Sequence, residues 1–147
     1  MRRVAALTAA SVAIVGTALP SVAAPKPKPI TATYTATAAT PDPTGGVASD
    51  YSLCGQTVPG SFDKRPFTVP AAGTLKVELS GYVNDWDLLL MDGAGKELAG
   101  SGSGGYAPAP APEVVTVKFK KKTPVQIVAC NWAGGPTGTV TYTFTYK

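Results

Sequence analysis

Two aspartates, Asp85 and Asp87, are the residues whose type and spacing best fit chemistry. Side chains two positions apart share one face of a strand, and Asn84 and Asp92 border the same segment. Paired carboxylates can act as a general acid and a general base. The same four side chains, with backbone carbonyls, could instead hold calcium, which takes six to eight oxygen ligands. A structural interpretation, with Asp87 bonding backbone amides and Asp92 as a turn residue, ranks above calcium, and catalysis ranks last because nothing completes a catalytic set.

The chain has no histidine, which excludes the catalytic arrangements that depend on an imidazole. Ser-His-Asp and Cys-His mechanisms and His-ligated metal sites all need an imidazole. The two cysteines, Cys54 and Cys130, are too few for a structural zinc site, and in an exported chain they are expected to pair. In the chain-entropy model such a long disulfide loop adds roughly 4 to 5 kcal/mol of stability. We therefore expect a protein that is not an enzyme and needs no cofactor, with calcium as the one candidate.

Aromatic side chains outside the predicted core are candidates for sugar binding, because aromatic faces suit the C–H groups of carbohydrates. Trp132 lies between Asn131 and a glycine pair, and Tyr106 lies in a loop rich in glycine, alanine and proline. Trp86 belongs to an apolar run and is expected in the core. Packing beside the disulfide is the other interpretation of Trp132.

A lysine cluster marks one predicted hairpin end and could meet anionic wall polymers or acidic glycans. Its members are Lys118, Lys120, Lys121 and Lys122. A solvated loop that blunts a sheet edge is the more ordinary interpretation of such a run. The threonine-rich faces of the predicted strands could bind ice-like or glycan surfaces, and a solvated β face is again the ordinary explanation.

The first 23 residues are typical of a secretory signal peptide. Met1-Arg2-Arg3 supplies the positive start, residues 4–19 are mostly apolar, and Ser21-Val22-Ala23 predicts cleavage after Ala23. The apolar run is too short and interrupted for a stable membrane span of about 20 residues. A stiff Pro/Lys linker, residues 24–29, follows the cut. We expect a secreted, extracellular protein with no stable membrane span after processing.

The charge of the chain does not indicate a nucleic-acid partner. The chain has 13 Lys and Arg against 9 Asp and Glu, a net charge of +4, and two of the arginines leave with the signal peptide. The aromatic residues are not interleaved with the basic ones. The expected partner is an extracellular protein or polysaccharide of unknown identity.

Two-residue periodicity predicts the fold that must position these residues. From Ile30 to Thr37 apolar residues alternate with threonine, and residues 139–146 repeat the scheme. Further short strands are expected at 67–69, 75–79, 86–91, 96–99, 115–119 and 125–129. No stretch of the processed chain has a capped helical period. About eight strands, with 16 glycines and 14 prolines, predict one all-β domain over residues 30–147, a two-sheet antiparallel β-sandwich.

Three segments, in this order along the chain, match sequence motifs of a known family. Phe67-Thr68-Val69-Pro70-Ala71-Ala72-Gly73-Thr74-Leu75-Lys76-Val77 has the form strand, turn, strand. Asp85-Trp86-Asp87-Leu88-Leu89-Leu90-Met91-Asp92 contains an Asp-x-Asp-Leu-x-Leu word, followed by Gly93 and Gly95, and Val140-Thr141-Tyr142-Thr143-Phe144 fits a closing strand. In these segments the chain resembles the bacterial pre-peptidase C-terminal domain family. The resemblance implies a jelly-roll-like β-sandwich of the kind usually appended to secreted proteases and other exported enzymes, of which some bind calcium.

The chain departs from this family in three respects. Lys122-Thr123-Pro124-Val125-Gln126-Ile127 stands where the family has a Gly-x-Tyr-x-hydrophobic strand start, the Cys54–Cys130 pair is not a general family mark, and we expect the module to stand without a peptidase domain. The resemblance implies a secreted, non-catalytic accessory or binding module. Two alternatives stay open. One is a calcium-stabilised extracellular glycan- or matrix-binding protein, and the other is a small secreted protease inhibitor that presents the loop 100–112.

Overall fold

The computed structural model describes residues 25–42, 56, 58–102 and 110–147. These residues form eight β-strands and no α-helix. Within the same ranges there is accordingly no helix with the length and apolarity needed to cross a membrane. The predicted signal peptide, residues 1–23, lies outside the described residues, so secretion and cleavage after Ala23 stay predictions.

Each strand expected from the two-residue periodicity is present. The bounds are β1 (Ile30–Thr37), β2 (Phe62–Val69), β3 (Gly73–Ser80), β4 (Trp86–Asp92), β5 (Glu97–Ser101), β6 (Glu113–Phe119), β7 (Thr123–Asn131) and β8 (Thr137–Tyr146). The all-β class is therefore confirmed.

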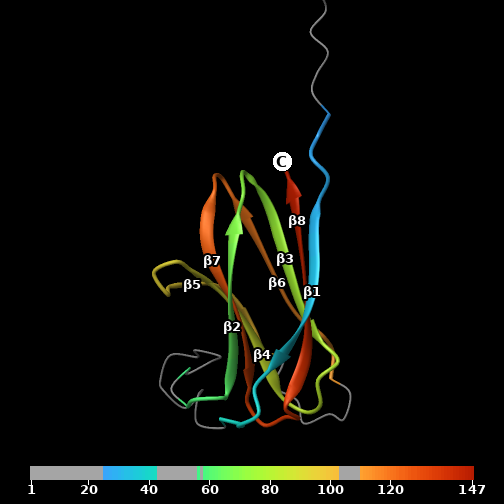
Figure 1. Ribbon diagram of the computed structural model, residues 1–147, viewed down its shortest axis with the longest axis vertical. Coiled ribbons are helices and arrows are strands. Elements are labelled where there is room, and N and C mark those ends of the chain that lie inside the picture. Colours follow the sequence, from blue (N-terminus) through green and yellow to red (C-terminus); the bar gives the residue numbers. More distant parts are fainter. Residues whose placement is uncertain (1–24, 43–55, 57, 103–109) are drawn as a thin grey trace, which may run out of the picture.

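The strands form two four-stranded sheets that pack as a sandwich (Figure 1). Their orders are β1-β8-β3-β6 and β2-β7-β4-β5, and all neighbours are antiparallel. The pairs β1–β8, β2–β7, β3–β6 and β4–β5 nest inside one another along the chain, as when one long hairpin folds over on itself. This nesting is the jelly-roll arrangement. The predicted two-sheet antiparallel β-sandwich is confirmed.

In both sheets, every second side chain points toward a shared core. On β3 the side chains of Leu75, Val77 and Leu79 are fully buried, whereas Lys76 between them is exposed. The alternation predicted for β1 and β8 is present as well, with threonines outward and apolar residues inward. Fully burying an aliphatic or aromatic side chain stabilises the fold by about 1.5 to 3 kcal/mol. The largest fully buried core side chains are Trp86, Phe144, Leu75, Leu79, Leu88, Leu90 and Ile127.

Two strands in the middle of the second sheet are buried on both faces. Leu88 and Leu90 of β4 belong to the main core, whereas Leu89 between them packs with Val128 and Cys130 of β7 in a second cluster. The continuous apolar run of β4 is thus explained as expected, by burial on both faces. Cys54, the predicted disulfide partner of Cys130, lies outside the described residues, so the disulfide stays a prediction.

Strand β2 begins at Phe62, five residues before the start that the sequence predicted, and this is the main correction to the expected elements. Its first five residues include three charged residues and Pro66, which mask the apolar alternation. A proline fits there because β2 pairs only with β7 and lies at the edge of its sheet, where one side of the strand needs no backbone donor.

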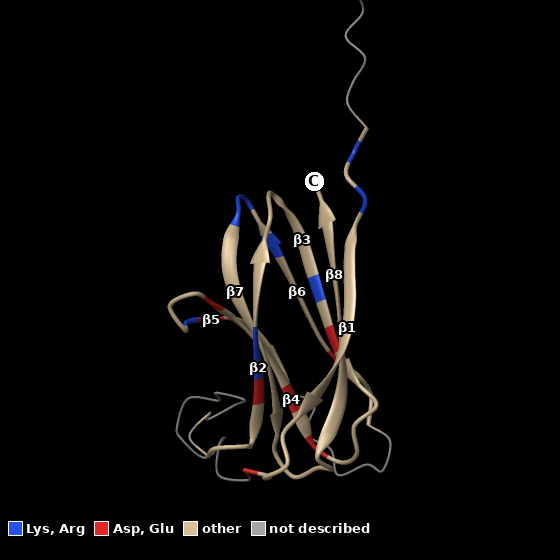
Figure 2. Ribbon diagram, in the orientation of Figure 1, with Lys and Arg blue, Asp and Glu red and all other residues tan. Residues whose placement is uncertain are grey.

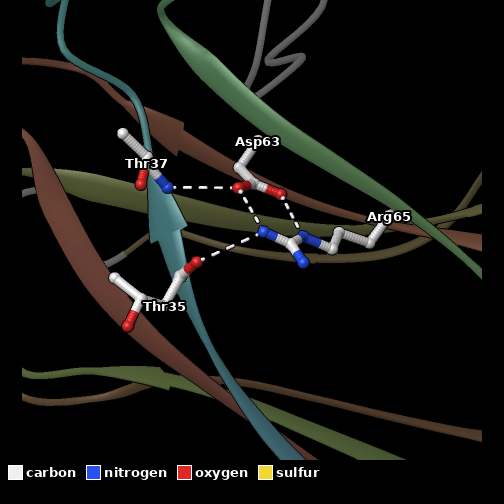
Figure 3. A network of polar contacts seen from close by, with 4 residues as sticks. All are labelled: Thr35, Thr37, Asp63 and Arg65. Carbon is white, nitrogen blue, oxygen red and sulfur yellow. Dashed lines mark hydrogen bonds and ion pairs between the residues drawn. The ribbon is translucent and has the colours of Figure 1, made fainter.

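A polar network closes the seam between the two edge strands β1 and β2 (Figure 3). The carboxylate of Asp63 accepts from the backbone N–H of Thr37 at 3.1 Å and pairs with Arg65 Nε at 3.0 Å. Arg65 also donates to the backbone carbonyl of Thr35 at 3.4 Å, and its guanidinium lies 4.4 Å from the ring centroid of Tyr34. The network thus satisfies backbone groups on the open edge of β1 with side chains of the other sheet.

We expect Asp63→Ala to loosen β1. The backbone N–H of Thr37 loses its acceptor and Arg65 loses its ion pair, so the free energy of unfolding should fall by about 1 kcal/mol. Amide hydrogen exchange at Thr37 should accelerate, whereas Glu97→Ala, an exposed change on β5, should leave that amide unaffected. An unchanged exchange rate at Thr37 would show that Asp63 does not hold the edge.

Candidate functional site

The predicted aspartate pair lies at one end of the sandwich, where β4 begins. Asp85 is 9% exposed and Asp87 is 5% exposed. The backbone carbonyl of Asp85 accepts from the N–H groups of Trp132 and Ala133, each at 3.1 Å. Asn84, which is half-buried, has a φ of 61° and turns the chain into the strand. Three of the four predicted calcium ligands, which are neighbours in the sequence, therefore lie at this end of the sandwich.

Burial governs the chemistry of Asp87. Loss of solvent around its carboxyl group raises the pKa of Asp87 to about 7, and the nearby charges of Asp85 and Glu113 act in the same direction. Glu113, at the start of β6, is itself buried and accepts from the hydroxyl groups of Ser101 and Tyr82. The sequence analysis missed Glu113, because its partners lie in β5 and in the loop between β3 and β4, which the fold brings next to it.

Asp92 does not join this pair. It lies at the far end of β4, roughly 16 Å from Asp87 at the rise of a β-strand. Its Oδ1 accepts from the backbone N–H groups of Ala94 and Lys96, both at 2.9 Å, so it shapes the β4–β5 turn as the structural interpretation predicted. Within the described ranges no three His, Cys, Asp or Glu side chains gather so as to hold a metal ion. For Asn84, Asp85 and Asp87, calcium binding stays a prediction.

The aromatic candidates have different outcomes. Trp86 is fully buried, and its indole Nε1 donates to the carbonyl of Gly135 at 3.1 Å, so it belongs to the core as expected. Trp132 is half-buried. Tyr106 lies outside the described residues, as does most of the loop 100–112 that an inhibitor would present, so both ideas stay predictions.

The structure shows a groove at the opposite end of the sandwich, which the sequence analysis did not find. It has a volume of about 480 Å³ and lies where β3 begins and where β6 and β8 end. Its lining comes from Ala72, Gly73, Thr74, Lys118, Phe119, Lys120, Thr145, Tyr146 and Lys147. Two members of the predicted lysine cluster, Lys118 and Lys120, thus line a concave site. The other two, Lys121 and Lys122, are exposed in the adjacent β6–β7 turn.

Strand register places the two aromatic residues of the lining on either side of Gly73. Gly73 pairs with Phe119 of β6 on one side and with Tyr146 of β8 on the other. A Cβ atom at position 73 would collide with the carbonyl oxygen of Thr145 and with the ring of Phe144. Only glycine fits so close to these atoms, because the ring of Phe144 occupies the space that a side chain at position 73 would need.

The charged side chains of the groove lining are all basic. Lysines gather at the β6–β7 turn and beside the groove (Figure 2), and no described Asp or Glu lines the groove. The Pro/Lys segment 25–29 leaves the sandwich at the same end (Figure 1). A concave site lined by lysines attracts and concentrates anions.

Comparisons with known proteins give little further guidance. No family model matches the chain, and no curated protein matches it. One similar solved structure is a fucose-binding module of Streptococcus pneumoniae, with 16% sequence identity and a TM-score of 0.32. The alignment covers 77% of this chain and 89% of that one.

Proposed function

We propose that this protein is a non-catalytic β-sandwich module that acts outside the cell by binding a negatively charged sugar in the groove between β3, β6 and β8. The observation that carries the proposal is the lining of the groove, which includes three lysines and two aromatic residues. The proposal retains the idea of an accessory module similar to pre-peptidase C-terminal domains, and it adds a ligand class and a place where the ligand binds.

The two kinds of side chain suit the two parts of an acidic sugar. Phe119 and Tyr146 are half-buried and pack against the core, and the parts of their rings that stay exposed offer apolar contact to the C–H groups of a pyranose. The ammonium groups of the lysines pair with a carboxylate, and each adds to a local positive potential. A small open site of this kind suits dissociation constants in the micromolar to millimolar range, which is about −8 to −4 kcal/mol.

The lining also supports binding without bond cleavage. None of the described residues that form the groove has a carboxylate, imidazole or thiol side chain. General acid–base hydrolysis of a glycosidic bond uses a pair of carboxyl groups that flank the bond. The buried carboxyl groups of Asp85 and Asp87 lie at the other end of the sandwich, where β4 begins.

We expect the chain to bind a glucuronate-containing disaccharide and to ignore its neutral glucose counterpart. A Lys118→Gln/Lys120→Gln double variant removes two positive charges from the groove and should weaken binding at least tenfold, or about 1.4 kcal/mol. Added salt should also weaken the wild-type interaction, because exposed charges are screened. Isothermal titration calorimetry at low and physiological ionic strength measures both effects.

Lys64→Gln/Lys96→Gln is the matched control, because it also removes two positive charges and both lysines are exposed and do not line the groove. Its binding constant should equal that of the wild type. Equal losses in the control and in the Lys118→Gln/Lys120→Gln variant would show that the effect follows net charge and not the groove. Equal binding of the neutral disaccharide would refute an anionic ligand.

A further inference from the structure

The outer face of the first sheet carries two facing rows of threonine, which we call the threonine ladder. One row belongs to β1 and the other to β8. Its members are Thr31, Thr33, Thr35, Thr37, Thr139, Thr141, Thr143 and Thr145. The four on β1 are exposed, and those on β8 range from half-buried to exposed.

Register and hydrogen bonding order the hydroxyl groups of the ladder. Thr31 pairs with Thr143 and Thr33 pairs with Thr141, and their hydroxyl oxygens lie 3.1 Å and 2.9 Å apart. A hydroxyl group donates one hydrogen bond and accepts up to two, so each bonded pair keeps one donor and further acceptor positions for a ligand. The side chains are oriented before a ligand arrives, which lowers the entropy cost of binding.

The ladder has the length of several sugar residues. Side chains on one face of an antiparallel strand repeat every 6.8 Å or so, and neighbouring strands lie about 4.8 Å apart. From Thr139 to Thr145 the β8 row extends for roughly 20 Å at that rise. A disaccharide would cover only part of this distance.

The ladder leads into the groove. Thr145 is both the last threonine of the β8 row and part of the groove lining, and Thr74, its partner on β3, lines the groove too. The charged neighbours of the ladder on β3 neutralise each other, because Lys76 Nζ pairs with Glu78 at 3.0 Å. The surface is therefore positive in the groove and without net charge along the ladder.

We infer that the groove and the threonine ladder together bind one linear acidic polysaccharide, an inference that rests on the proposed function of the groove. An anionic sugar occupies the groove beside Lys118, Lys120 and Thr145. The following residues of the same polymer run along the ladder, where neutral sugars exchange hydrogen bonds with the threonine hydroxyls. A polymer in which acidic and neutral sugars alternate fits this distribution of charge better than one that is charged at every residue.

Chain length of the ligand tests this inference directly. We use oligosaccharides that alternate glucuronate with N-acetylglucosamine, two or eight residues long, and titrate each into the chain by calorimetry. The octasaccharide should bind at least tenfold more tightly than the disaccharide, beyond the about fourfold statistical gain from its four repeats. A Thr33→Val/Thr141→Val variant, which keeps the side-chain shape and removes one hydroxyl pair, should lose most of that gain and bind the disaccharide as the wild type does.

Thr68→Val is the control, because Thr68 is exposed on β2 of the other sheet. It should bind both oligosaccharides as the wild type does. If the two lengths bind equally tightly per repeat, or if the threonine variant keeps the gain, the ladder is a solvated face and the inference is overturned while the proposed function stands. If neither length binds, the proposed function fails and the inference fails with it.

Discussion

Asp87→Asn is expected to stabilise this protein at pH 8 and to change its stability little at pH 4. Burial and the charges of Asp85 and Glu113 raise the pKa of Asp87 to about 7, from an ordinary value near 3.8. At pH 8 the wild type must hold an ionised carboxylate in a site that favours the neutral acid. Each unit of pKa shift corresponds to about 1.4 kcal/mol. Replacing the ionised carboxylate with a neutral amide therefore adds at most about 4 kcal/mol to the free energy of unfolding.

The direction of the pH dependence follows from the raised pKa. A carboxyl group whose folded pKa exceeds its unfolded pKa binds a proton more tightly in the folded state. The stability that this proton confers is complete below about pH 4 and is lost as the pH rises through about 7. Urea unfolding of wild type and Asp87→Asn from pH 4 to pH 8 should therefore give curves that diverge across this window. Glu97→Gln, an exposed change on β5, should give a constant difference.

The same experiment bears on calcium. A bound calcium ion would favour the ionised carboxylate, so it should raise the melting temperature of the wild type at pH 8 and have no effect on Asp87→Asn. If millimolar calcium does not shift the melting temperature of the wild type, the predicted calcium site is refuted. An Asp87→Asn variant that is less stable than the wild type at pH 8 without calcium contradicts the raised pKa, because the ionised group would then be stabilised by its surroundings.

The fold could be predicted because two-residue periodicity is a local signal. The alternation in β1 and β8 marks strands whose apolar sides face a core, and the continuous run of β4 marks a strand covered on both faces. The start of β2 was missed for the same reason. Asp63, Lys64 and Arg65 lie on an edge strand and face solvent or the neighbouring sheet, so no apolar alternation is required of them.

Only part of the groove could be predicted from the sequence. The lysines of residues 118–122 stand out as a run of like charge, and they were identified as a candidate for anionic ligands. The aromatic part was hidden, because Gly73, Phe119 and Tyr146 are far apart in the chain and meet only through the register of β3 with β6 and β8. A sequence pattern shows which face a side chain takes, but the choice of neighbouring strand is a tertiary property.

Asn131 was not identified from the sequence either, because its contacts are also a tertiary property. Its replacement should have the second large effect on stability. Its side chain is 1% exposed at the end of β7. Its Nδ2 donates to the carbonyl of Ala38 at 2.7 Å and lies within 3.2 Å of the carbonyls of Gly134 and Gly135, and its Oδ1 accepts from the N–H of Gly134 at 2.6 Å. One amide thus joins the chain after β1 to the turn that leads into β8.

Asn131→Ala should lower the free energy of unfolding by about 3 to 5 kcal/mol, because it leaves several buried backbone groups without their partner. For a domain of this size that loss lowers the melting temperature by more than about 10 °C. Calorimetric or circular dichroism melts measure it, with Gln126→Ala as the control, since Gln126 is a half-buried amide on the same strand.

Asn131→Asp separates hydrogen bonding from packing. The carboxylate has nearly the shape of the amide and can still accept from Gly134, but its second oxygen meets the carbonyl of Ala38 where the amide donated. This crowding of oxygens favours the protonated acid, so the variant should be strongly destabilised at pH 7 and should recover as the pH falls through its raised folded pKa. If Asn131→Asp is as stable as the wild type at neutral pH, or if Gln126→Ala costs as much as Asn131→Ala, the donated bonds of Asn131 do not hold this end of the sandwich together.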